Sequence, residues 1–168
     1  MNTLETDRDI IARLAIERED ANDHFADFLR RYNSEMLDCM VHQINDEIAP
    51  RIDCTACGAC CRSLMINVTT EEKIRMAAHL DIPEDTFAND FLEEGLAGNL
   101  IMNTIPCTFL SGNLCTVYED RFSSCRDFPH LYQEGFQRRL FVTFMHYGRC
   151  PIVYNVIETL KMKTGFKA

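Results

Sequence analysis

Four cysteines within eight residues are the strongest constraint that this sequence sets on its fold. Residues 54–61 read Cys-Thr-Ala-Cys-Gly-Ala-Cys-Cys, which is the pattern C-x-x-C-x-x-C-C. A C-x-x-C turn directs two thiolates towards one point, and small residues between the cysteines let the backbone wrap closely around an ion. Gly58 also tolerates the positive φ that such tight loops often need. Because a hydrophobic core does not require four cysteines in eight residues, the pattern predicts a metal site.

The cellular compartment decides how the cysteines of the whole chain are interpreted. The chain has nine: Cys39, Cys54, Cys57, Cys60, Cys61, Cys107, Cys115, Cys125 and Cys150. The N-terminus has no basic segment followed by an apolar core, so we expect no secretory signal. We therefore expect a cytoplasmic protein, in which metal binding or redox chemistry is favoured over disulfides. A thioredoxin-like interpretation of C-x-x-C fits less well, because the motif does not follow a strand in a βαβ pattern.

Composition and charge exclude several classes of partner. The 168 residues are 46% hydrophobic, which is enough for one domain with a real core. The formal net charge is −9, of which −7 falls on residues 1–50. Nucleic acids and anionic membranes both require a basic surface, so we expect no binding to either. No apolar run approaches the length of a membrane span, which also argues against a membrane protein.

The first 50 residues predict a helical segment. Apolar side chains recur every three or four residues over 4–48, with charged residues on the other faces. Asn33-Ser34 predicts an interruption, with Ser34 capping a second helix that Pro50 ends. Cys39 lies within that second helix, and we interpret it as a small buried hydrophobe rather than a ligand. These helices could cover the metal domain, or bind a protein partner or a second copy of the chain.

Residues 51–168 predict a second domain of short strands and helices. Residues 64–68 suggest a strand, and Thr69 followed by Glu71 and Glu72 suggests a capped helix start. A further helix is expected from Pro83 to about residue 95, a strand over 140–144, and a C-terminal helix over 152–163. The expected fold class is α+β, with N-terminal amphipathic helices followed by a small, cysteine-rich, metal-centred core.

A second cysteine-rich stretch supplies further candidate ligands. Residues 111–113 read Ser-Gly-Asn, which predicts a turn between two short extended runs. Cys107 and Cys115 would then flank a hairpin and approach one another. Cys125 follows ten residues later, and Cys150 precedes Pro151 near the start of the predicted C-terminal helix.

Together these residues resemble the YkgJ-type cysteine-cluster family of bacteria, whose members carry a domain described as zinc- or iron-chelating. The resemblance covers about residues 51–151 and rests on the cysteine spacing, on Pro-Cys-x-Phe-Leu at 106–110, and on Cys-Arg at 125–126. It implies a set of eight metal-binding cysteines, with Cys39 left out: Cys54, Cys57, Cys60, Cys61, Cys107, Cys115, Cys125 and Cys150.

The chemistry of the ligands limits the metal to two classes. Thiolates favour zinc or iron–sulfur, because hard ions such as Mg²⁺ and Ca²⁺ prefer oxygen. Eight thiolates equal two tetrahedral zinc sites, or one iron–sulfur cluster with four cysteines to spare. We favour iron–sulfur by a small margin, because C-x-x-C-x-x-C followed by a remote Cys-Pro is similar to the ferredoxin pattern. Arginines beside the cysteines would offset thiolate charge and lower thiol pKa values: Arg51, Arg62, Arg126 and Arg149.

Three functions remain open from the sequence. The protein could be a metal-chelating domain with a structural or sensory metal, an iron–sulfur redox or methyl-transfer component, or a zinc-stapled adaptor without chemistry. A similar cysteine motif occurs in flagellin lysine methylases, which is why methyl transfer is considered. No P-loop, G-x-G-x-x-G, G-x-S-x-G or H-E-x-x-H motif is present, so no catalytic residue is assigned. His130 and His146 are the histidines nearest to the later cysteines, and we interpret both as packing residues.

Overall fold

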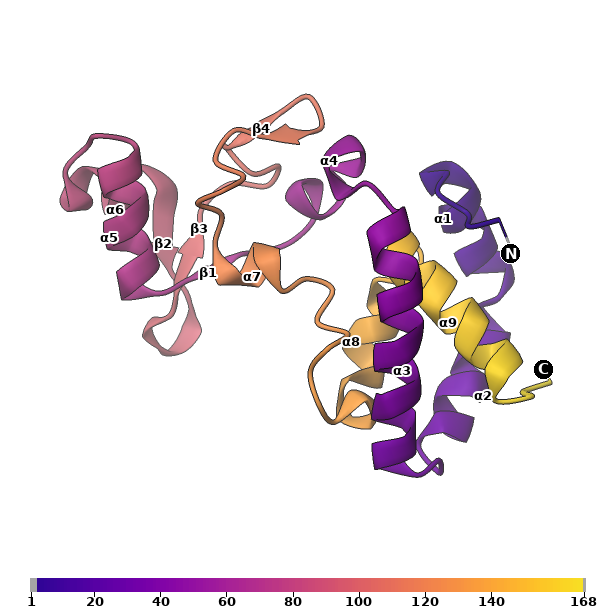
Figure 1. Ribbon diagram of the computed structural model, residues 1–168. Coiled ribbons are helices and arrows are strands. Elements are labelled where there is room, and N and C mark those ends of the chain that lie inside the picture. Colours follow the sequence, from indigo (N-terminus) through magenta and orange to yellow (C-terminus); the bar gives the residue numbers. More distant parts are fainter. Residues whose placement is uncertain (1–2, 168) are drawn as a thin grey trace. The chain divides into compact units, whose positions relative to one another are not determined.

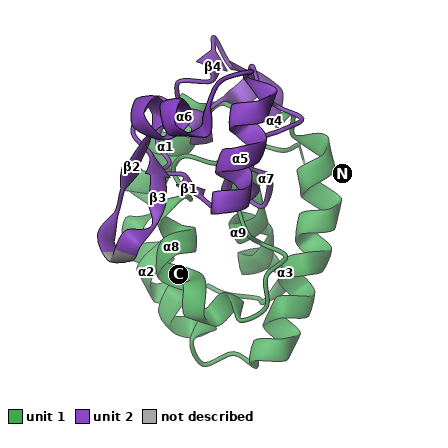
Figure 2. Ribbon diagram, turned by 90° about the vertical axis from the view of Figure 1, so that its left-hand side faces the viewer, with its two compact units in different colours: residues 1–53, 129–168 green, residues 54–128 purple. Residues whose placement is uncertain are grey.

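The computed structural model describes residues 3–167 and divides the chain into two compact units. The helical unit comprises residues 1–53 and 129–168, and the cysteine unit comprises residues 54–128 (Figure 2). The sequence-based division at residue 50 stays a prediction, because a compact unit need not be an independently folding domain. The predicted α+β class is confirmed, since helices are joined by a few short strands in two small sheets.

The helical unit is built from α1 (Arg8–Glu17), α2 (Glu19–Leu29), α3 (Ser34–Ile48), α8 (Leu140–Met145) and α9 (Pro151–Lys163). A 3₁₀ turn at Ala49–Arg51 follows α3, and another at Phe136–Arg139 precedes α8. Helix α9 lies against α3 and α1, and α8 lies against α2 (Figure 1). Every residue from Pro151 to Ile157 is buried, which identifies α9 as the centre of this unit.

Two local predictions for the helical unit need correction. The cap of α3 is Asn33 rather than Ser34, because the Asn33 side chain accepts a hydrogen bond from the Met36 N–H at 2.9 Å. Residues 140–144 form helix α8 instead of a strand. Leu140 and Thr143 are buried while Phe141 is 74% exposed, so burial follows a helical spacing of three. The predicted C-terminal helix over 152–163 is confirmed by α9.

The cysteine unit has a small apolar core, and its helices and strands are short. Its helices are α4 (Cys54–Cys57), α5 (Thr70–His79), α6 (Glu84–Phe91) and α7 (Ser123–Arg126), with 3₁₀ turns at Cys60–Arg62 and Leu96–Gly98. Strands β1 (Asn67–Val68), β3 (Leu100–Met102) and β2 (Leu92–Glu94) form an antiparallel sheet in that order. Strands β4 (Leu110–Ser111) and β5 (Leu114–Cys115) form a separate hairpin.

The predicted start of helix α5 is confirmed in detail. The Thr69 side chain accepts from the Glu72 N–H, and the Glu72 carboxylate accepts from the Thr69 N–H at 3.0 Å, which is a capping box. The same carboxylate also accepts from the N–H of Ser123, the first residue of α7. Glu72 therefore joins the start of α5 to the short helix that carries Cys125. Across residues 3–167, no helix has both the length and the apolar character needed to cross a membrane.

Candidate metal centre

The C-x-x-C-x-x-C-C segment folds as two short helical turns joined by Gly58. Helix α4 carries Cys54 and Cys57, and the following 3₁₀ turn carries Cys60 and Cys61. Gly58 has a φ of +61°, the left-handed conformation that glycine adopts at little cost. Adjacent side chains point apart in an extended chain, but here the helical turn brings the sulfurs of Cys60 and Cys61 to 3.9 Å. The doubled cysteine is therefore a close thiol pair.

The β4–β5 hairpin forms around the predicted turn, and the residues that lead into it bring Cys107 to the cysteine segment. The Cys107 N–H donates to the Cys61 carbonyl at 2.8 Å, although 46 residues separate them in sequence. Leu110 pairs with Cys115 across the hairpin, and the Leu110 N–H donates to the Cys107 carbonyl at 3.0 Å. Backbone hydrogen bonds therefore link Cys61, Cys107 and Cys115 into one frame.

Arg62 and Asn113 clasp the cysteine segment to the tip of the hairpin. The Arg62 guanidinium donates to the Gly58 carbonyl at 2.9 Å, to the Gly112 carbonyl at 2.6 Å and to Asn113 Oδ1 at 2.7 Å. Asn113 Nδ2 in turn donates to the Ala56 carbonyl at 2.8 Å. The sequence showed Asn113 only as a turn residue and Arg62 only as a charge beside cysteine. Their pairing depends on the tertiary structure.

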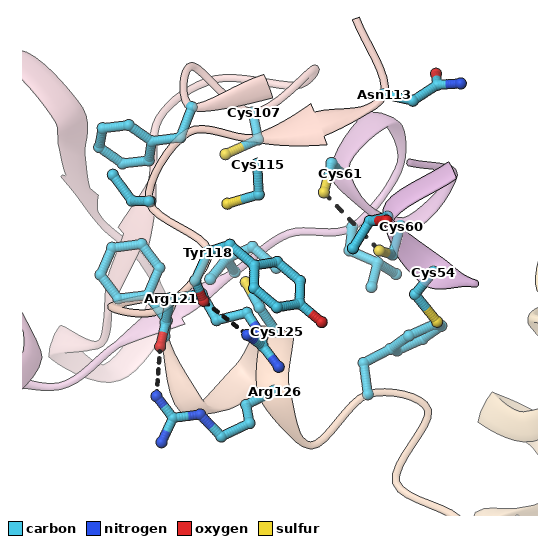
Figure 3. Close-up of a pocket in the computed structure, with 17 residues that line it drawn as sticks. Cys54, Cys60, Cys61, Cys107, Asn113, Cys115, Tyr118, Arg121, Cys125 and Arg126 are labelled. Carbon is cyan, nitrogen blue, oxygen red and sulfur yellow. Dashed lines mark hydrogen bonds between the residues drawn. The ribbon is translucent and has the colours of Figure 1, made fainter. Parts of the chain in front are cut away.

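Six of the predicted ligands line one cavity of about 150 Å³ in the cysteine unit. They are Cys54, Cys60, Cys61, Cys107, Cys115 and Cys125, and Figure 3 shows them arranged around it. Its apolar wall includes Leu64, Ile66 and Phe109, and its polar lining includes Arg121 and Arg126. Arg121 lies 3.8 Å over the Tyr118 ring, in a cation–π contact. Sequence reasoning missed Arg121, because it is four residues from the nearest cysteine.

The Cys61 thiol is the most acidic of those whose pKa the surroundings clearly change. A hydrogen bond with the Cys60 thiol lowers the pKa of Cys61 to about 6, against the opposing effect of burial. The positive charge of Arg62 lowers it further. At neutral pH Cys61 is therefore largely a thiolate, which is the form that binds metals.

The thiols of Cys107, Cys115 and Cys125, which pack against the apolar core of the cysteine unit, have raised pKa values. Burial raises the pKa of Cys125 to about 12, and burial is also the main cause at Cys107 and Cys115. Repulsion from neighbouring thiolates adds to this effect, and every pair among Cys61, Cys107, Cys115 and Cys125 interacts in this way. Arg121 partly offsets it at Cys115 and Cys125. All four cysteines line the same cavity, in which nearby positive charge favours the thiolate form.

The remaining cysteines lie elsewhere. Cys57 belongs to α4 but does not line the cavity. Cys150 is buried at the start of α9, in the helical unit, and its ligand role stays a prediction. Cys39 is exposed on α3, so the prediction that it is buried was wrong. Arg51, Arg149, His130 and His146 also belong to the helical unit, so of the four flanking arginines Arg62 and Arg126 lie in the cysteine unit.

The donor set fits a soft metal, although the thiols do not converge on one point. Within residues 3–167, no group of three His, Cys, Asp or Glu side chains is close enough to hold a metal ion. The six cavity cysteines are nevertheless the ligands that zinc, iron and iron–sulfur clusters prefer. The space that they surround is polar only at the thiols and at a few side chains such as Arg121, Arg126 and Asn113.

Six cysteines around one cavity are the kind of donor set that metal-chelating proteins use, and comparison with known proteins identifies the family. Residues 53–147, more than half of the chain, match the CxxCxxCC family, whose description is "Putative zinc- or iron-chelating domain". The chain therefore belongs to this family, as the sequence resemblance indicated. The match ends before Cys150. No curated protein and no solved structure matches the chain.

Proposed function

We propose that this protein binds its metal in the cavity of the cysteine unit, as an iron–sulfur cluster held by thiolates. The observation that carries the proposal is that six cysteines from three separate stretches of sequence line one cavity of about 150 Å³. The proposed ligands are the six predicted cysteines that line the cavity: Cys54, Cys60, Cys61, Cys107, Cys115 and Cys125. The ligand roles expected for Cys57 and Cys150 stay predictions. The family membership supports a zinc- or iron-chelating role but leaves the metal open.

The size and lining of the cavity favour a cluster over a single ion. In a tetrahedral zinc site with Zn–S bonds of about 2.3 Å, the sulfurs lie about 3.8 Å apart. Such a site would gather at least three donors closely, and no such group occurs in residues 3–167. A cavity that is wider than one ion, and lined by thiols, suits a polyatomic group with iron and sulfide. Arg62, Arg121 and Arg126 offset the negative charge that such a group would add.

Metal and acid-labile sulfide analysis tests the proposal on full-length protein purified without oxygen. We expect iron and sulfide in equal amounts, with visible absorbance that bleaches on reduction. Cys125→Ser should lose most of both, whereas Cys39→Ser, the matched control on the surface of α3, should keep both. A colourless protein with zinc and no sulfide would contradict the iron–sulfur proposal while leaving chelation intact.

A zinc-stapled adaptor is the second candidate, and one distance favours it. The sulfurs of Cys60 and Cys61 are 3.9 Å apart, which matches an edge of a tetrahedral zinc site. In that case the metal would be structural, and the acidic N-terminal helices would supply the surface for a protein partner or a second copy. About two zinc ions per chain, with no sulfide, would support this candidate.

The proposed site also bears on where the protein works. Metal-binding thiols stay reduced in the cytoplasm, and the same cysteines would be driven towards disulfides in an oxidising compartment. A cytoplasmic location is therefore part of this proposal. Thiol trapping in intact cells should find the cavity cysteines reduced or metal-protected. Finding them oxidised would overturn both the location and the metal site.

A further inference from the structure

Helix α8 carries large apolar side chains that the helical unit leaves exposed. Phe141 is 74% exposed, Val142 52% and Met145 48%, and we refer to these three residues as the α8 face. Leu140 and Thr143 on the same helix are buried, so one side of α8 packs against its unit while the α8 face points to solvent. Large apolar side chains that are exposed side by side, with polar residues around them, mark surfaces for interaction.

Arginines flank the α8 face at both ends. Arg138 lies three residues before Phe141, and Arg149 lies four residues after Met145. Both arginines are exposed, and within residues 3–167 neither forms an ion pair with a carboxylate. Residues 129–150 contain three arginines and one glutamate, which gives this segment a formal charge of +2 in a chain of −9. The α8 face is therefore an apolar centre with a basic residue beyond each end.

The composition of this surface matches that of protein interfaces. Aromatic residues, Met and Arg are enriched at interfaces between proteins, where Lys and Glu are depleted. We propose that the α8 face docks an amphipathic helix of a partner protein, with the apolar stripe of that helix on Phe141, Val142 and Met145. The partner helix would carry acidic residues beyond both ends of its stripe, opposite Arg138 and Arg149. A helix is the matching shape, because its side chains recur at the three- and four-residue spacing of α8 and can interdigitate with them.

Charge disfavours a second copy of this chain as the occupant. In a symmetric contact the same surface patch meets itself. Arg138 and Arg149 would then lie opposite other arginines, whether the two copies of α8 ran parallel or antiparallel. Like charges opposed across an interface are unfavourable, and an acidic partner helix avoids this by placing carboxylates there.

The charge of the helical unit also disfavours a membrane as the occupant. Anionic lipids attract clusters of basic residues beside exposed apolar side chains. Residues 1–50, however, belong to the same unit as α8 and have a formal charge of −7. A bilayer is broad enough to meet this negative charge as well as the two arginines, whereas a single helix meets the α8 face alone. A protein partner therefore fits better. The proposal goes beyond the proposed function, because α8 does not contribute to the cavity of the cysteine unit.

Binding of two model helices tests the proposal. Each is a dye-labelled peptide of about 18 residues with a stripe of leucines, which is long enough to form a helix. One peptide has glutamates beyond both ends of the stripe, and the other has lysines in their place. Fluorescence anisotropy measures the affinity of the full-length protein for each. We expect the glutamate helix to bind about tenfold more tightly than the lysine helix, or better.

Substitutions assign this binding to the α8 face. Phe141→Ser should weaken binding of the glutamate helix by about tenfold or more. Ile16→Ser should leave it unchanged, because this matched exposed apolar residue lies on α1. The double variant Arg138→Glu/Arg149→Glu should reverse the preference, so that the lysine helix binds more tightly. All four side chains are exposed, so thermal unfolding should be the same in every variant.

Several outcomes would overturn the proposal. These are equal affinity for the two model helices, no effect of Phe141→Ser, or an unchanged preference in the double arginine variant. Vesicles of phosphatidylcholine and phosphatidylglycerol provide a further comparison. If they bound the protein more tightly than the glutamate helix does, and Phe141→Ser abolished that binding, the occupant would be a membrane surface. Self-association of the chain that Phe141→Ser abolishes would instead identify a second copy, and either result would replace the protein partner proposed.

Discussion

The two units of this chain differ in the interactions that stabilise them. The helical unit buries large side chains such as Phe25, Leu29 and Tyr147 almost completely. Some of its inner polar groups are held in a hydrogen-bond network, although the buried His42 Nε2 has no hydrogen-bond partner within residues 3–167. Glu158, for example, accepts hydrogen bonds from Tyr147 at 2.7 Å and Lys161 at 2.8 Å, and pairs with Arg18. The core cluster of the cysteine unit comprises ten buried residues among those described in residues 54–128, and the strands of this unit have only two or three residues each. Its remaining interior is a cavity lined by thiols.

This difference implies different dependence on metal. A small core seldom supplies more than a few kcal/mol of stability, so natural domains of this size often add a metal or disulfides. When a metal completes such a fold, the free energy of binding becomes free energy of folding. The helical unit should therefore stay folded without metal, and the cysteine unit should not.

The largest effects on the free energy of unfolding should come from two matched substitutions, each of which creates a cavity in the core of one unit. Phe25 in the helical unit and Phe87 in the cysteine unit are both fully buried. Each change to Ala should cost about 3–5 kcal/mol in the unit that contains it. Phe87→Ala should also weaken zinc binding by about 100-fold or more, because binding is coupled to folding there. Phe25→Ala should leave zinc affinity unchanged, as measured by competition with a chelating dye. Equal loss of affinity in both variants would contradict the comparison.

Substitutions of two glycines test the hydrogen bonds by which Arg62 and Asn113 join the cysteine segment to the hairpin. Their expected effect on the free energy of unfolding is intermediate in size. Gly58 and Gly112 both have a φ of +61°, so a change to Ala strains each backbone by about 1–2 kcal/mol. A Cβ at Gly58 would in addition lie 2.5 Å from Arg62 Nη1 and 3.2 Å from the Asn113 backbone, whereas one at Gly112 meets nothing within 4 Å. Gly58→Ala should therefore cost about 3 kcal/mol in denaturant unfolding of the cysteine unit, and Gly112→Ala about 1 kcal/mol. If both variants lost the same free energy of unfolding, the contacts of Arg62 and Asn113 would contribute nothing to the stability of the cysteine unit.

The smallest effect expected concerns Glu72 and has a defined pH dependence. Burial raises the pKa of this carboxyl, but hydrogen bonds from the Thr69 and Ser123 N–H groups outweigh it, so the net pKa is lowered. A lowered folded-state pKa stabilises the fold above the ordinary glutamate pKa of 4.5, and this contribution is lost as the pH falls through the folded-state pKa. Glu72→Gln should thus cost about 1–2 kcal/mol at pH 7.

The matched comparison for Glu72 is Thr69→Ala, which removes the other half of the capping box at a cost of about 1 kcal/mol. Its effect should not change with pH between 7 and 4, whereas the gap between Glu72→Gln and the unmodified chain should narrow below pH 4.5. Chemical denaturation of the metal-loaded protein at each pH measures both. If the difference in unfolding free energy between Glu72→Gln and the unmodified chain were the same at every pH, the charge of Glu72 would not contribute to stability.

Local signals in the sequence predicted local structure well, and long-range packing decided the rest. The Thr69 cap and the turn at 111–113 were predictable because each depends on a few adjacent residues. Residues 140–144 look like a strand by composition, but packing of Leu140 and Thr143 in the helical unit makes them helical. Cys39 is apolar, yet the buried face of α3 is set by Leu37, Val41 and Ile44, which leaves Cys39 on the other side.

The candidate site shows the same limit. The cysteine pattern predicted a metal-binding family, which the family match confirms. It could not predict that Cys60 and Cys61 would lie together, because that depends on a 3₁₀ turn instead of an extended chain. Nor could it predict that Arg121 lines the cavity or that Arg62 reaches Asn113, since no sequence pattern marks contacts across 51 residues.

Hydrogen exchange resolved by peptide, before and after metal removal with a chelator, tests the central claim most directly. The account predicts that residues 54–128 lose most of their protection without metal, while α3 and α9 keep theirs. Adding the metal back should restore the protection. Unchanged protection in residues 54–128, or equal loss in both units, would contradict the view that metal completes the cysteine unit alone.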